Sequence, residues 1–144
     1  MIIYFGNVLS KHGLNKTTIE DLGLKLSGYY KVYLYSSFKN PIIRFFDMLF
    51  ALLRKRKLIK LVLIDTYSTK AFYYSFTIGL LSKVLNIPFI PILHGGNLYV
   101  RFKRTTALTL NLFKNASLII SPSKYLINQF KPLGFEIIYI PNFI

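Results

Sequence analysis

Short apolar stretches alternate along the chain with longer segments in which apolar residues recur every three or four positions. The first pattern predicts buried strands, and the second predicts helices packed on one face. Strands are expected at 1–5, 29–35, 58–64, 88–93, 117–121 and 136–140. Helices are expected from about Thr18 to Gly28, over 42–53, over 71–83, within 99–115 and from Ser123 to about Lys131. About six strands alternating with helices predict an α/β fold, a Rossmann-like doubly wound parallel sheet with helices on both faces.

Two of these helices have clear start patterns. Thr17 and Glu20 have the spacing of a capping box, and Asn40 precedes Pro41, which suits the first turn of a helix. The second helix, over 42–53, is apolar almost all round and runs into four basic residues at 54–57. A helix of this kind either docks on a core or lies in a membrane interface.

Composition excludes several classes of protein. The 144 residues make one domain, and 53% hydrophobic with 17% charged residues favours a packed core over disorder. Without cysteine there is no disulfide framework or thiolate metal site, and two histidines with five acids predict no metal site. A reducing, cytoplasmic setting fits this composition.

Neither a membrane span nor a leader is expected. The longest stretch without a charged residue, 84–100, contains two prolines and an adjacent glycine pair, so it cannot form a regular spanning helix. The first residues, MIIYFGN, have no basic region and are typical of a first strand.

The net charge of +14 suits nucleic acid, an anionic membrane surface or a phosphorylated substrate. The basic residues are scattered, and no nucleic-acid motif interleaves them with exposed aromatic residues. We therefore expect no nucleic-acid partner, and a nucleic-acid-binding domain is the least favoured of the functional classes considered below.

Polar residues collect where the predicted strands end, at 6–13, 65–69, 94–97 and 121–123. In an open α/β sheet the carboxyl ends of the strands face one crevice, where ligands bind. The sharpest of these boundaries is the change from PFIPIL to His94-Gly95-Gly96-Asn97, which brings one titratable ring and a flexible backbone to that edge. A histidine at a strand end is otherwise a turn or core residue, and the glycines would then only form the turn.

Two other candidates have structural alternatives. Asp65 either orients an acceptor hydroxyl or acts as a base, or it caps the following helix. The loop from Gly6 to Gly13, which contains Asn7, precedes a helix amino terminus whose free N–H groups attract phosphate. Ser123 is expected to be a helix cap, and residues 54–57 a solvated helix end.

In order, LIDTYST, IPFIPILHGGN, ASLIISPS and IIYIPN resemble the amino-terminal domain of family 4 glycosyltransferases, which have the GT-B fold. The resemblance covers nearly the whole chain. It implies an acceptor-side domain, with the nucleotide-sugar donor held mainly by a second, carboxyl-terminal Rossmann-like domain that this chain lacks. The family more often has Pro-Asn-Gly where this chain has PNF at 141–143, so the expected hinge differs there.

The resemblance also implies roles for individual residues. His94 would hydrogen-bond the transferred sugar and stabilise charge as the bond to the nucleotide breaks, with Asp65 as the second catalytic candidate. Residues implied to lie near the donor or its phosphates are Gly6, Asn7, Gly13, Gly95 and Gly96. Residues expected to contact the acceptor are Tyr67, Ser68, Asn97 and Arg101.

The sequence therefore predicts the acceptor-side half of a retaining glycosyltransferase, acting on a glycan or a lipid-linked acceptor. It needs no cofactor beyond the nucleotide-sugar co-substrate. Its partners are the missing donor domain, in the same or a separate chain, and an anionic membrane surface contacted through 42–57. The alternative is a non-catalytic binding module or a subunit of a split glycosyltransferase.

Overall fold

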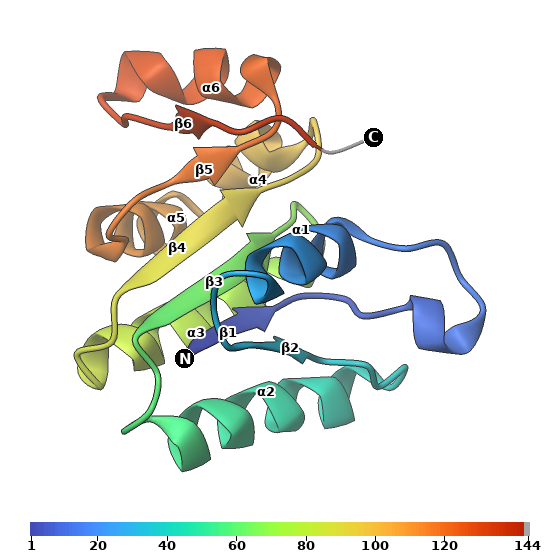
Figure 1. Ribbon diagram of the computed structural model, residues 1–144. Coiled ribbons are helices and arrows are strands. Elements are labelled where there is room, and N and C mark those ends of the chain that lie inside the picture. The colour runs from blue at the N-terminus through green and yellow to red at the C-terminus, as the bar shows by residue number, and fades with distance from the viewer. Residues whose placement is uncertain (143–144) are drawn as a thin grey trace.

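In the computed structural model, which describes residues 1–142, six parallel strands form one sheet with helices on both faces (Figure 1). The strands are β1 Ile2–Phe5, β2 Val32–Tyr35, β3 Leu61–Thr66, β4 Phe89–Leu93, β5 Ile120–Ser121 and β6 Ile138–Tyr139. The helices are α1 Thr18–Ser27, α2 Pro41–Lys55, α3 Phe72–Val84, α4 Leu98–Arg104, α5 Thr106–Asn115 and α6 Lys124–Phe130, with 3₁₀ turns η1 Ser10–His12 and η2 Lys131–Leu133. The predicted α/β doubly wound fold is confirmed.

The strand order β2-β1-β3-β4-β5-β6 determines which face each helix covers. The connection from β1 to β2 runs in one direction across the sheet, and every later connection runs in the other. Because crossovers between parallel strands are right-handed, α1 lies on one face and the later helices lie on the opposite face. We call these the α1 face and the five-helix face.

The two faces have separate cores of unequal size. The five-helix face buries Phe5, Leu52, Ile64, Phe72 and Phe130 together with many other side chains of the helices. The α1 face buries a smaller set, Ile2, Tyr4, Val8, Ile19, Leu63, Ile90 and Ile92. Among the described residues, α1 is the one α-helix on this side of the sheet, and it packs on β1 and β2.

The start patterns seen in the sequence are confirmed. Helix α1 begins at Thr18, and the Glu20 carboxylate accepts a hydrogen bond from the Thr17 backbone N–H at 3.0 Å. Helix α2 begins at Pro41, where the Asn40 side-chain oxygen accepts from the N–H groups of Ile42 and Ile43. Ser123 caps α6 by accepting from Leu126 N–H.

Several predicted boundaries were wrong. Residues 99–115 form two helices, α4 and α5, separated at Thr105, whose backbone is not helical. The strand predicted at 58–64 begins at Leu61 and continues to Thr66, so Asp65 lies inside β3 rather than in the loop after it. The expected hinge beyond Asn142 lies outside the described residues.

Helix α2 is apolar on both its inner and its outer side. Met48, Ala51 and Leu52 are buried against the five-helix face. A second set of apolar side chains points to solvent, namely Ile42, Ile43, Phe46, Phe50 and Leu53. Among residues 1–142, no helix combines the length and apolar character needed to cross a membrane.

Candidate functional site

The candidate site lies where the strand order reverses, between β1 and β3. Open α/β sheets bind ligands outside the carboxyl ends of the strands at such a point. Gly6 directly follows β1, Asp65 is the last residue but one of β3, and His94 directly follows β4. Tyr4 pairs with Leu63, and Asp65 pairs with Ile92. Because side chains alternate along a strand, Tyr4, Asp65 and His94 all point to the α1 face.

Asp65 is the centre of this group, because one of its oxygens accepts two hydrogen bonds. The Tyr4 hydroxyl donates to Oδ1 at 2.7 Å, and His94 Nε2 lies 2.9 Å from the same atom. The Asp65 backbone is held as well, since Ser75 Oγ donates to its carbonyl oxygen at 2.9 Å. The Asp65 side chain is 0% exposed. These contacts exclude the alternative in which Asp65 caps α3.

Tyr4 is a neutral donor to this carboxylate. Its burial, the charge of Asp65 and the hydrogen bond between them raise the pKa of the Tyr4 hydroxyl far above its ordinary value of 10.0. The hydroxyl therefore keeps its proton throughout the physiological range. We define the Asp65 cluster as Tyr4, Gly6, Asp65, Tyr67 and His94.

His94 is fixed on three sides. Its backbone N–H donates to the Thr66 carbonyl oxygen at 2.9 Å, which extends the pairing of β3 with β4. The Tyr67 ring stacks on the imidazole with centroids 5.0 Å apart, and burial and the nearby Asp65 charge raise the pKa of the Tyr67 hydroxyl. With Nε2 at Asp65, Nδ1 has no hydrogen-bond partner within the described residues. Nδ1 is therefore the ring nitrogen that remains for a ligand.

The second oxygen of Asp65, Oδ2, is buried without a partner among the described residues. It lies against Gly6, where an added Cβ would come within 2.6 Å of Oδ2 and 3.1 Å of Ile19 Cδ1. Gly6 therefore allows β1 and the first turn of α1 to close over the carboxylate. Its role here is steric, because its backbone is not in the left-handed region.

Replacement of Gly6 by alanine is expected to lower the free energy of unfolding by about 1–3 kcal/mol, because the methyl group overpacks the Asp65 cluster. Urea unfolding of the purified chain measures this change. The matched control is Gly96→Ala, since a Cβ at Gly96 meets nothing within 4 Å. Equal effects of the two substitutions would contradict the packing argument.

Of the residues expected near the donor phosphates, only Gly6 joins the cluster. The Asn7 side-chain oxygen accepts from Arg44 at 2.9 Å, and its carbonyl oxygen accepts from Thr17 Oγ1 at 2.6 Å. Gly13 ends η1 with φ of 75°, and a side chain there would meet only open space. The loop that contains η1 lies away from the sheet (Figure 1). Gly95 also has a positive φ, 84°, as its turn requires, whereas a side chain at Gly96 would meet only open space.

Glu20 holds the loop between β1 and α1. One of its oxygens accepts from the Ser10 backbone N–H and hydroxyl, and the other accepts from Thr17. Partial burial opposes ionisation, but these hydrogen bonds outweigh it and lower the pKa of Glu20 below its ordinary value of 4.5. This carboxylate also occupies the N–H of Thr17 that a phosphate at the start of α1 would use.

The lowered pKa predicts a pH dependence of stability. A group with a lower pKa in the folded state contributes stability above its ordinary value of 4.5, and this contribution disappears as the pH falls through the folded-state pKa. We expect Glu20→Gln to flatten this part of the pH profile of unfolding free energy. Glu136→Gln, at an exposed glutamate, is the control. An unchanged slope in Glu20→Gln would contradict the assignment.

The four predicted acceptor residues lie in two segments that a hydrogen bond joins. Arg101 Nε donates to the Ser68 carbonyl oxygen at 2.8 Å, and its guanidinium lies 5.4 Å from the centre of the Tyr73 ring. Tyr67 covers His94, as described above, and Asn97 is exposed before α4. This bond therefore ties the segment after β3 to the helix after the HGGN turn.

Two residues of the site were missing from the sequence prediction, namely Tyr4 and Ser75. The sequence could have indicated Tyr4, because it lies inside the apolar run IIYF and a buried tyrosine hydroxyl needs a hydrogen-bond partner. Nothing in the sequence indicates Ser75. Within residues 1–142 no three metal-ligating side chains come together.

Comparison with family models, curated proteins and solved structures finds no match for this chain.

Proposed function

We propose that this domain is the acceptor-side half of a retaining glycosyltransferase that moves a sugar from a nucleotide-sugar donor to a glycan or lipid-linked acceptor. One observation carries the proposal: a buried Asp65–His94 pair at the carboxyl ends of adjacent strands, 2.9 Å between Nε2 and Oδ1. It leaves one imidazole nitrogen for a ligand at the edge where such folds bind ligands. The motif order given above supports the same proposal.

The contacts suggest different roles for the two residues. His94 would contact the transferred sugar through Nδ1 and stabilise charge as the bond to the nucleotide breaks. Asp65 would act as a positioning residue, because its side chain is fully buried and Oδ1 is occupied by Tyr4 and His94. That burial does not support a base acting directly on the acceptor. Tyr67, Ser68, Asn97 and Arg101 would lie on the acceptor side.

The 144-residue chain alone is expected to fold and to transfer no sugar, because a cleft between two domains needs both walls to exclude water. Calorimetric titration with a panel of nucleotide sugars should give weak or no binding, and a nucleotide-release assay should give no turnover. Tight donor binding with turnover would contradict the half-enzyme proposal. Binding of sugars or glycans that never leads to transfer, even with a donor-binding domain added, would favour the non-catalytic binding module.

A peripheral membrane location, at the cytoplasmic side, is part of the proposal. Its support is the outer side of α2, where Ile42 is 66% exposed and Phe50 is 60% exposed. The basic residues 54–57 follow at the end of the helix, where Arg54, Arg56 and Lys57 are exposed and the Lys55 ammonium lies 3.8 Å from the centre of the Tyr33 ring. Apolar side chains beside a cationic cluster suit the interface of an anionic bilayer.

Vesicle sedimentation tests this location directly. Each Lys or Arg near an anionic surface contributes about 1 kcal/mol, so replacing residues 54–57 by neutral residues should abolish most of the binding. Salt should weaken the binding, and neutral vesicles should bind less. Replacing both Phe46 and Phe50 by serine tests the apolar contribution. Equal binding to neutral and anionic vesicles would contradict the electrostatic part.

A further inference from the structure

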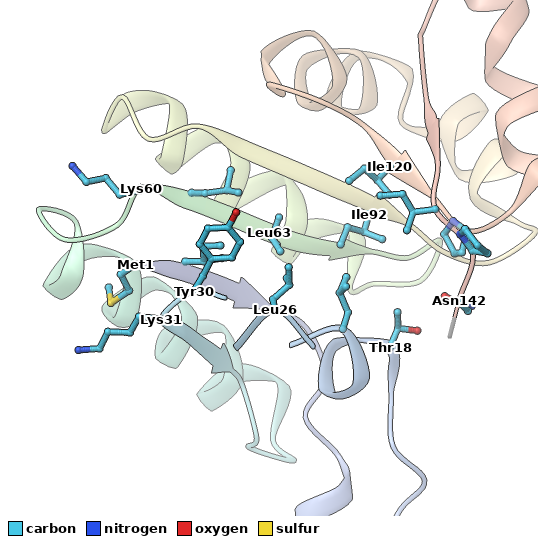
Figure 2. A pocket seen from close by; sticks show the side chains of 16 residues that line it. Met1, Thr18, Leu26, Tyr30, Lys31, Lys60, Leu63, Ile92, Ile120 and Asn142 are labelled. Carbon is cyan, nitrogen blue, oxygen red and sulfur yellow. The ribbon is translucent and has the colours of Figure 1, made fainter. Parts of the chain in front are cut away.

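The α1 face carries an apolar groove that offers no partner to a charged ligand (Figure 2). Side chains such as Leu26, Leu63 and Ile92 line it. The side chains of Lys31 and Lys60 lie at one end and point away from it (Figure 2). A cation positioned for a ligand is found instead at the carboxyl edge of the sheet.

Arg101 of α4 is held in a fixed position at this edge. Its Nε donates to the Ser68 carbonyl oxygen at 2.8 Å. The guanidinium lies 5.7 Å from the centre of the Phe72 ring and 5.4 Å from the centre of the Tyr73 ring. One hydrogen bond and two ring contacts therefore orient the group before any ligand arrives.

The outer edge of this guanidinium, formed by Nη1 and Nη2, is free. Neither nitrogen of Arg101 has a hydrogen-bond partner within the described residues. Neither is buried, because Asp65 Oδ2 is the one buried side-chain nitrogen or oxygen without a partner in this part of the chain. Arg44 differs, since its Nε and Nη2 donate to the Phe38 carbonyl oxygen and its Nη1 donates to the Asn7 side-chain oxygen. Arg44 joins two loops, whereas Arg101 keeps one edge for a ligand.

No acid neutralises Arg101 within the described residues. Residues 66–135 contain eight lysines and arginines and no Asp or Glu. Asp65 is buried and already accepts from Tyr4 and His94. A guanidinium edge with two parallel N–H groups matches a carboxylate or a phosphate. Because the side chain is already ordered, binding such a group costs little further conformational entropy.

The two segments that hold Arg101 also hold His94. Ser68 directly follows Tyr67, whose ring stacks on the His94 imidazole, and α4 begins directly after the HGGN turn. Phe72 belongs to the core of the five-helix face, so Arg101 lies on that side of the edge. His94 points to the α1 face. A ligand that reaches both residues would therefore cross the carboxyl edge of the sheet.

We propose that Arg101 binds an anionic group of the ligand, a phosphate or a carboxylate, through Nη1 and Nη2. Arg104, three positions further along α4 and exposed, adds positive charge on the same side of the helix. The link to sugar transfer rests on the proposed function. Under that function the acceptor is charged, and it carries the anionic group beside the hydroxyl that receives the sugar.

The first test compares two arginine side chains in nuclear magnetic resonance titrations of the chain with glucose, glucuronate and glucose 1-phosphate. We expect at least one of the two anions to shift the Arg101 Nε–H signal saturably, and glucose to leave it unchanged. The Arg44 Nε–H signal is the control, because the protein occupies that guanidinium. The anion that binds more tightly identifies the group as carboxylate or phosphate. No Arg101 shift with either anion, an equal shift with glucose, or equal shifts of both arginines would overturn the proposal.

The second test uses variants that remain folded in thermal unfolding. Arg101→Gln should lower affinity for the tighter anion roughly tenfold, because a charged hydrogen-bond donor is lost. Arg101→Lys should recover only part of the affinity, since an ammonium lacks two parallel N–H groups. Lys114→Gln, at an exposed lysine of α5, is the control for net charge. Wild-type affinity in Arg101→Gln, or an equal loss in Lys114→Gln, would overturn the assignment.

The His94 ring signals separate this inference from the proposed function. A His94 response to neutral sugars, with Arg101 silent toward both anions, would overturn the anion site and leave the proposed function standing. A saturable response of Arg101 to an anion, with His94 silent toward every sugar ligand, would support the anion site and contradict the proposed function.

Discussion

Replacing His94 by alanine is expected to lower turnover by about 10²–10³-fold in an enzyme that joins this domain to a donor-binding domain, as the proposed function requires. The loss should fall on kcat more than on the KM for the acceptor, because the proposed contact strengthens in the transition state. A loss of this size is expected because the imidazole is already held in position. Asp65, Tyr67 and the backbone bond to Thr66 hold the imidazole in place before the substrate arrives.

The control for this variant is already in the chain. His12, the other of the two histidines, is exposed in η1, so His12→Ala should keep its turnover. Asp65→Asn should reduce turnover by less than His94→Ala, because an amide oxygen can still accept from Nε2. If turnover and folding survive unchanged in His94→Ala, His94 is a structural residue of the strand end.

Asp65→Ala should lower the free energy of unfolding by about 3–5 kcal/mol, which is a large part of the stability of a small domain. It removes the acceptor for Tyr4 and His94 together and leaves two buried polar groups unpaired. Tyr4→Phe should cost only about 1 kcal/mol, since Oδ1 keeps its bond with His94. Urea unfolding of the 144-residue chain measures both values.

A double-mutant cycle distinguishes a coupled cluster from independent contacts. The combined effect of Asp65→Ala and His94→Ala should be smaller than the sum of the single effects, because both remove the same bond. Asp47→Ala, at a partly exposed aspartate of α2, is the comparison for loss of a carboxylate. Strict additivity, or an Asp65 effect no larger than that of Asp47, would contradict the cluster.

The sequence was a good guide to features that depend on local chemistry. The capping residues Thr17, Glu20 and Asn40 act through neighbours within three positions, so their spacing alone predicted where α1 and α2 begin. The apolar run before His94 forms a strand that ends at Leu93, where the polar and glycine residues begin, as predicted. The break between α4 and α5 was missed because Thr105 is neither glycine nor proline.

The pairings that make the site depend on strand register and could not be predicted in this way. Tyr4 and Asp65 are 61 positions apart, and they meet because β1 and β3 are neighbours with Tyr4 opposite Leu63. Extension of β3 to Thr66 points the Asp65 side chain toward α1, where it is buried, instead of leaving it in a loop.

The most direct test of the central claim is a nuclear magnetic resonance titration of the two histidine rings in the isolated chain. His94 and His12 give separate signals, and millimolar nucleotide sugars or sugar acceptors report even weak contacts. We expect at least one such ligand to shift the His94 ring signals and leave those of His12 unchanged, with the effect reduced in Asp65→Asn. Unchanged His94 signals with every sugar ligand, or equal shifts of both rings, would contradict a sugar site at the Asp65–His94 pair.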